Sequence, residues 1–118
     1  MSNGKYMSGR DFKKMIFGAM RTAHISALVD PSGQLREYSF LMPGGEIAML
    51  SWESFDAESE YIIEINGHEI ISVVIPKGRK IFSDEEQMVL DIFRVCAVQV
   101  ILQEQVMLHL HKNSKTYS

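Results

Sequence analysis

The stretch that decides the fold is Tyr61-Ile-Ile-Glu-Ile65, then Asn66-Gly67, then His68-Glu-Ile-Ile-Ser-Val-Val-Ile75. Two runs rich in β-branched residues flank the dipeptide Asn-Gly. Both residues of this dipeptide tolerate the positive φ that a two-residue type I′ turn requires, so the pattern is a strong local signal for a β-hairpin. The sequence therefore predicts two antiparallel strands, Tyr61–Ile65 and His68–Ile75, joined at Asn66-Gly67.

Three further strands are expected on the N-terminal side of this hairpin. Asp30-Pro-Ser-Gly33 is typical of a tight turn, and Pro43-Gly-Gly45 interrupts the next apolar run. The expected strands are His24–Val29, Leu35–Met42 and Glu46–Trp52, followed by a polar loop at Ser54–Ser59. Short connections between consecutive strands require antiparallel pairing.

A helix is expected at each end of this β region. Ser8-Gly-Arg-Asp11 and Ser83-Asp-Glu-Glu86 both have the spacing of a capping box, in which the first and fourth residues bond each other's backbone N–H groups. After the first box, apolar residues recur at the spacing of one helical face, and Phe17 lies off this face. The face consists of Phe12, Met15, Ile16, Ala19, Met20 and Ala23.

The last helix, expected from Ser83 to about His109, has more apolar surface than one sheet face can cover. One side consists of Met88, Val89, Ile92, Phe93, Cys96, Ala97, Val100 and Ile101, and a second side of Val95, Val98, Leu102 and Val106. Because surplus exposed apolar surface marks a partner interface, we expect a homodimer. Its expected contacts are Val98, Leu102 and Val106, together with Phe17. The alternative is a wide core face within a thick domain.

The predicted fold is α+β, with a five-stranded antiparallel sheet flanked by the N- and C-terminal helices. The helices are the elements available to cover one face of this sheet. At 118 residues, the chain has the length of one domain, 1–118. Residues 1–7 and 112–118 are expected to be loose ends.

Composition argues against several classes of function. The net charge is −3, and the longest basic cluster is Lys77-Gly-Arg-Lys80, so nucleic-acid binding is not expected. The apolar run Val95–Leu102 is too short to span a membrane, and the first residues lack the apolar segment of a signal peptide. A single cysteine precludes an intrachain disulfide. We therefore expect a cytoplasmic protein.

No constellation of catalytic residues is recognisable, so we expect a protein that is not an enzyme and carries no cofactor. Cys96 falls among apolar residues in the middle of the last helix, where a thiol is expected to be buried and unreactive. His109-Leu-His111 supplies two imidazoles, whereas a structural zinc site uses four ligands. We therefore expect no metal site.

From about Glu64 to Gln105 the sequence resembles a GAF domain. The run Glu64–Pro76, then Gly78-Arg-Lys80, then Phe82-Ser-Asp-Glu-Glu86 and the long apolar helix are similar to the hairpin and helix with which GAF domains close. The resemblance implies a GAF/PAS-like fold and a sensory module of signal transduction that dimerises through its terminal helices. Because Glu53–Glu60 is too short for a GAF-type lid, we expect weak or absent small-molecule binding.

The sequence thus predicts a non-catalytic sensory or regulatory module that acts through homodimerisation and contacts with a protein partner. A degenerate GAF-type ligand-binding domain is one form that this module could take. The alternative is a roadblock/longin-like adaptor or scaffold for a GTPase or another complex, since such adaptors also pack helices on a five-stranded antiparallel sheet. The sequence identifies neither the partner nor a ligand.

Overall fold

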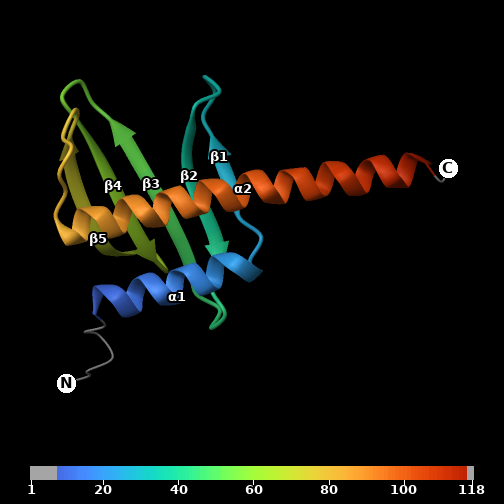
Figure 1. The fold of residues 1–118 in the computed structure, drawn as a ribbon, viewed down its shortest axis with the longest axis horizontal. Coiled ribbons are helices and arrows are strands. Elements are labelled where there is room, and N and C mark those ends of the chain that lie inside the picture. The colour runs from blue at the N-terminus through green and yellow to red at the C-terminus, as the bar shows by residue number, and fades with distance from the viewer. Residues whose placement is uncertain (1–7, 117–118) are drawn as a thin grey trace.

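The computed structural model describes residues 8–116, which form two helices and five strands (Figure 1). The elements are α1 (Gly9–Thr22), β1 (Ser26–Val29), β2 (Leu35–Leu41), β3 (Ile47–Ser54), β4 (Glu58–Ile65), β5 (His68–Pro76) and α2 (Asp84–Thr116). The strands form one antiparallel sheet in the order of the chain, from β1 at one edge to β5 at the other. The predicted α+β fold is confirmed.

The β4–β5 hairpin has the two-residue turn that Asn66-Gly67 predicts. The φ angle is 52° at Asn66 and 80° at Gly67, and Ile65 lies opposite His68. Two consecutive residues with positive φ are the mark of a type I′ turn. Asn66 also joins this turn to β3, because its N–H donates to the Ile47 carbonyl at 2.8 Å and its Oδ1 accepts from the Ile47 N–H at 2.9 Å.

The β3–β4 connection is shorter than the predicted loop Ser54–Ser59. Because β3 continues to Ser54 and β4 begins at Glu58, residues 55–57 alone separate the two strands. Ser54 lies opposite Ser59, and the ladder continues from there. Composition misled the prediction, since polar residues are readily accepted at the exposed end of an antiparallel pair.

The predicted N-caps are present at both helices. At α2 the capping box is complete, because the Ser83 N–H donates to Glu86 Oε1 at 2.9 Å and the Glu86 N–H donates to Ser83 Oγ at 3.1 Å. At α1 the Asp11 N–H donates to Ser8 Oγ at 3.1 Å. The prediction for the end of α2 was wrong: the helix continues past His109 to Thr116, so residues 112–116 are helical rather than a loose tail. The predicted loose arm, residues 1–7, lies outside the described residues.

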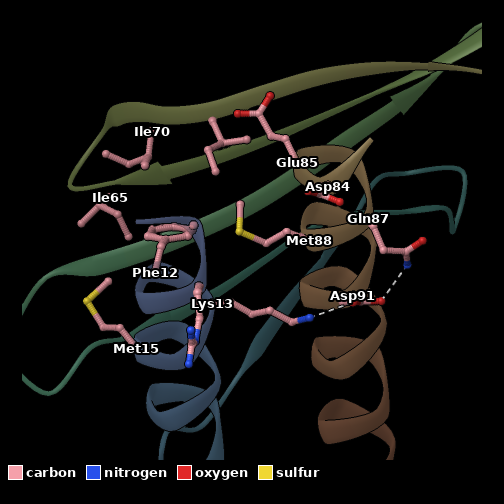
Figure 2. A pocket seen from close by; sticks show the side chains of 13 residues that line it. Phe12, Lys13, Met15, Ile65, Ile70, Asp84, Glu85, Gln87, Met88 and Asp91 are labelled. Carbon is pink, nitrogen blue, oxygen red and sulfur yellow. Dashed lines mark hydrogen bonds and ion pairs between the residues drawn. The ribbon is translucent and has the colours of Figure 1, made fainter. Parts of the chain in front are cut away.

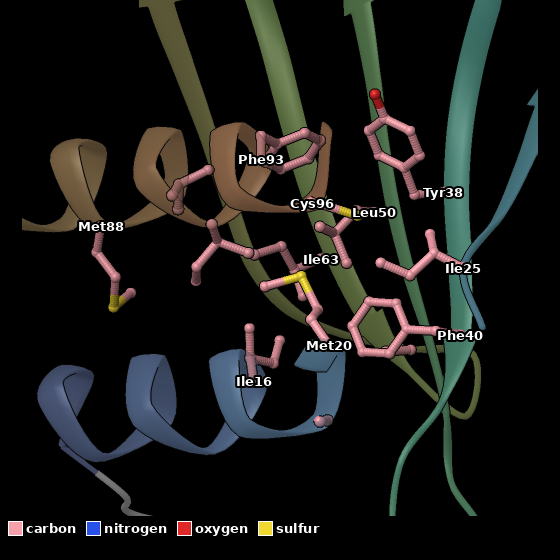
Figure 3. Packing of buried hydrophobic residues seen from close by; sticks show 14 of the residues in the cluster. Ile16, Met20, Ile25, Tyr38, Phe40, Leu50, Ile63, Met88, Phe93 and Cys96 are labelled. Carbon is pink, nitrogen blue, oxygen red and sulfur yellow. The ribbon is translucent and has the colours of Figure 1, made fainter. Parts of the chain in front are cut away.

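Both helices cover the same face of the sheet and run side by side in the same direction (Figure 1). Lys13 of α1 pairs with Asp91 of α2 at 2.9 Å. Side chains from both helices meet those of the central strands in one core (Figure 3). Its most deeply buried members include Ile16, Met20, Ile25, Leu50, Ile63, Val89, Ile92 and Cys96. Full burial of such an aliphatic side chain contributes about 1.5–3 kcal/mol, so this single layer supplies most of the stability.

Matched glycine substitutions test the assigned turn. Gly67→Ala should lower the free energy of unfolding by about 1–2 kcal/mol, because alanine must then hold a left-handed φ. Gly18→Ala, in the interior of α1, should raise it by about 0.5–1 kcal/mol, because the added Cβ meets no atom within 4 Å apart from its chain neighbours and the backbone of its own helix, and alanine favours a helix. Urea denaturation measures both. Effects of the same sign would contradict the turn assignment.

Candidate functional site

The predicted interface residues of α2 lie along one exposed side of the helix. Val98, Leu102 and Val106 are 48%, 49% and 58% exposed, and the half-buried Val95 precedes them. Val98 and Leu102 each lie two positions from Val100, whose side chain points into the core. At 100° per residue, two positions turn a side chain to the far side of a helix. Val98, Leu102 and Val106 therefore face away from the sheet. Together with Val95, which is half-buried and packs against the core, they are called the outer stripe.

Phe17 of α1 lies at the same level as the start of the outer stripe. Lys13 is opposite Asp91, and one turn further along these parallel helices Phe17 and Val95 follow. Both side chains are half-buried and pack against the core. Lys13 Nζ lies 5.6 Å from the centre of the Phe17 ring, within the range of a cation–π contact. Phe17 thus belongs partly to the core and partly to the surface beside the outer stripe.

Exposed apolar surface on α2 extends beyond the predicted interface. Ile101, which the sequence analysis assigns to the core side, is 55% exposed, and Met107, Leu108 and Leu110 are exposed as well. Among residues 95–108, Glu104 is the one residue that carries a charge at neutral pH. A helix side that remains in water normally carries charged residues, so this segment has the composition of a buried helix.

Gln103 determines where α2 leaves the sheet. Its Nε2 donates to the Ile25 carbonyl at 2.8 Å, and its Oε1 accepts from the Ile25 N–H at 2.8 Å. Ile25 directly precedes β1 and is buried. The side-chain amide thus bonds this backbone as a neighbouring strand would. The prediction that the first strand begins at His24 was wrong, since β1 begins at Ser26. Beyond this contact, α2 continues past the edge of the sheet (Figure 1).

A cleft of about 1080 Å³ opens where both helices begin, beside the Asn66-Gly67 end of the β4–β5 hairpin. Figure 2 shows apolar side chains converging there from α1, α2 and the hairpin. They are Phe12, Met15, Ile65, Ile70, Ile71 and Met88. The cleft can accommodate an apolar group. Sequence analysis missed it because three segments that are distant in the sequence form it.

The carboxylate of Asp91 at the border of this cleft is fully engaged by its neighbours. Lys13 Nζ donates to Oδ2 at 2.9 Å and Gln87 Nε2 donates to Oδ1 at 3.0 Å. These hydrogen bonds, that of Lys13 first, hold the pKa of Asp91 below its ordinary value. Asp91 therefore remains ionised at neutral pH and holds the two helices together, which does not suit the role of a proton donor.

Cys96 is buried, as its position in the sequence predicts. Its side chain is fully enclosed, and this burial raises the pKa of the thiol from 9.0 to about 12. A nucleophilic cysteine must be a thiolate near neutral pH. The structure therefore places Cys96 in the packing of the core and provides no group that would lower its pKa.

The described residues contain no group of three or more His, Cys, Asp or Glu side chains that could hold a metal ion. The side chain of His111 lies outside the described atoms, so the His109–His111 pair is not placed. Within the described chain, neither helix combines the length and apolar character needed to cross a membrane.

Comparisons of the chain with models of protein families, with curated proteins and with solved structures find no match. The GAF and roadblock/longin-like interpretations therefore remain predictions from the sequence pattern.

The raised pKa of Cys96 predicts a loss of stability in alkali. Above about pH 9 the thiol ionises in the unfolded chain, whereas in the folded protein it keeps its proton until about pH 12, so the free energy of unfolding falls as pH rises through this window. Cys96→Ala should be less stable at pH 7 by about 1 kcal/mol, through lost packing, but should lose less stability between about pH 8 and pH 10.5. Guanidinium denaturation across this range measures both. Equal pH dependence of the two proteins would contradict the prediction.

Proposed function

We propose that this domain is a non-catalytic regulatory module that works by self-association through the outer side of its two helices and by contact with a protein partner. The observation that carries the proposal is the outer stripe of α2, in which Val98, Leu102 and Val106 stand exposed on a helix whose other side is buried. The similarity of Glu64–Gln105 to GAF domains supports the regulatory role.

The physical argument for a second copy as the partner concerns apolar area, charge and rigidity. Each Å² of apolar surface removed from water contributes about 25 cal/mol, and a twofold axis buries the same stripe from both copies. On α2 the stripe is flanked by few charges, since Glu104 is the one charged residue from 95 to 108, so two copies of this part of the surface can meet with little electrostatic repulsion. Because the core and the Gln103–Ile25 hydrogen bonds already hold α2 in place, little conformational entropy is lost on association.

An adaptor function is the second candidate, and the uncovered face of the sheet favours it. Leu41 and Ile47 lie opposite each other on β2 and β3, next in sequence to the buried Phe40 and Ala48, so they point away from the helices. Val74 alternates in the same way with the buried Val73 and Ile75. All three are exposed. A protein partner could dock on this face while the helices hold the second copy.

Leu102→Glu tests the self-association surface. At micromolar concentration the wild type should sediment as an assembly of more than one chain, and the Leu102→Glu variant should sediment with a lower mass. The variant should remain folded, because Leu102 is already half exposed in a single chain. Ile81→Glu is the matched control, since Ile81 is 84% exposed in the connection before α2 and should leave the mass unchanged.

Sedimentation equilibrium measures the masses, and thermal melts followed by circular dichroism verify folding. A monomeric wild type would contradict the proposal. So would unfolding of Leu102→Glu, which would show that the outer stripe belongs to the core.

A further inference from the structure

The sheet-facing side of α2 continues beyond the sheet that it covers. Val89, Ile92, Cys96 and Val100 recur at spacings of three and four and are 9% exposed or less. The same spacing continues through Gln103 to Met107 and Leu110, which are 62% and 58% exposed. Figure 1 shows the reason: α2 crosses the sheet from β5 to β1 and then extends past β1 with no strand beneath it.

The positions of these exposed residues match the spacing of strands. Gln103 contacts the residue before β1 and so marks the edge of the sheet. With a rise of 1.5 Å per residue, Met107 lies about 6 Å and Leu110 about 10.5 Å beyond Gln103 along the helix. Neighbouring strands are about 4.8 Å apart. Met107 and Leu110 thus overhang the places of the first and second strands that would extend the sheet from β1.

β1 has an open edge, and no helix covers its residues. It is the edge strand of the sheet, and all four of its residues are exposed. Ala27 lies opposite Tyr38, whose side chain is buried beneath the helices, so Ala27 also faces the helix side yet remains uncovered. An open edge of this kind presents backbone N–H and C=O groups to which another strand can pair.

We propose that β1 pairs antiparallel with β1 of a second copy of this chain, about a twofold axis perpendicular to the sheet. Such an axis keeps the helices of both copies on the same face of a continuous sheet. Each overhanging α2, with Met107 and Leu110 on its underside, then covers the helix side of the other copy's β1. A second copy fits because each chain has both an overhanging helix with no strand beneath it and an edge strand that no helix covers. The twofold axis places the overhanging helix of each copy over the edge strand of the other.

This interface goes beyond the proposed function because it uses a different surface. The outer stripe points away from the sheet, whereas the β1 edge and the underside of α2 extend the sheet in its own plane. An axis between two outer stripes lies parallel to the sheet, so the two axes are perpendicular. Two perpendicular twofold axes close into a tetramer where they intersect, and otherwise continue into a larger assembly. The wild type should therefore sediment as a tetramer or a larger assembly at concentrations where both interfaces are occupied.

The test begins from Leu102→Glu, which removes the outer stripe and should leave a dimer held by β1. Adding Met107→Lys should weaken this dimer at least about tenfold, and so should adding Ala27→Lys, since an inward lysine blocks an edge strand. Both positions are exposed in one chain, so the fold should survive. Ile81→Lys, added to the same background, is the control and should keep the dimer.

Hydrogen exchange of the β1 amides identifies the pairing itself. In the Leu102→Glu dimer, the amides of Ser26–Val29 that face the free edge should exchange more slowly than in Leu102→Glu/Met107→Lys. The β1 amides bonded to β2 exchange alike in both and serve as the internal reference.

The outcomes separate the two proposals. If the wild type is a dimer and the Leu102→Glu variant is a monomer, the result overturns β1 pairing and supports association through the outer stripe. A wild-type dimer that resists Leu102→Glu but dissociates with Met107→Lys supports β1 pairing and overturns the outer stripe. A Leu102→Glu dimer whose β1 amides remain unprotected also overturns β1 pairing.

Discussion

Burial of one sheet face beneath α2 is the constraint on which the other features of this protein depend. The sheet is a simple meander, so its apolar side needs a cover that reaches from β5 to β1. Five strands span about 19 Å between the outermost two, a distance that about 13 helical residues bridge. The buried side chains from Met88 to Val100 occupy this length, whereas α2 has 33 residues. The remaining length of helix is left without a sheet to cover.

This surplus helix offers apolar surface that is suited to binding. Two groups that could carry chemistry are held by the fold: Cys96 fills the core, and Asp91 bonds Lys13 and Gln87. Glu86 bonds the backbone of Ser83, which is the first cause of its lowered pKa, and also pairs with Arg79. The outer stripe, by contrast, is exposed apolar surface of fixed orientation. Such surface suits association, in which affinity depends on shape and on little loss of entropy.

The few polar contacts between elements determine geometry more than stability. The Lys13–Asp91 pair is partly exposed, and such pairs contribute about 0–1 kcal/mol, yet this one holds the two helices in register. The paired hydrogen bonds between Gln103 and Ile25 place the departure of α2 at the beginning of β1. Asn66 fixes the position of the β4–β5 turn, because its two hydrogen bonds to Ile47 join this turn to β3. Both interfaces that we propose rely on this rigidity.

Local patterns in the sequence determined the secondary structure: the Asn66-Gly67 turn, the Ser83–Glu86 cap and the number of strands follow from φ preferences and short-range hydrogen bonds. Periodicity also identified α2 as apolar on several sides. It could not state what each side faces, because a stripe of valine and leucine has the same spacing over a sheet as in water. The exposure of Ile101, the cleft beside Met88 and the overhang of α2 beyond β1 depend on the width of the sheet relative to the length of the helix, and only tertiary packing decided that relation.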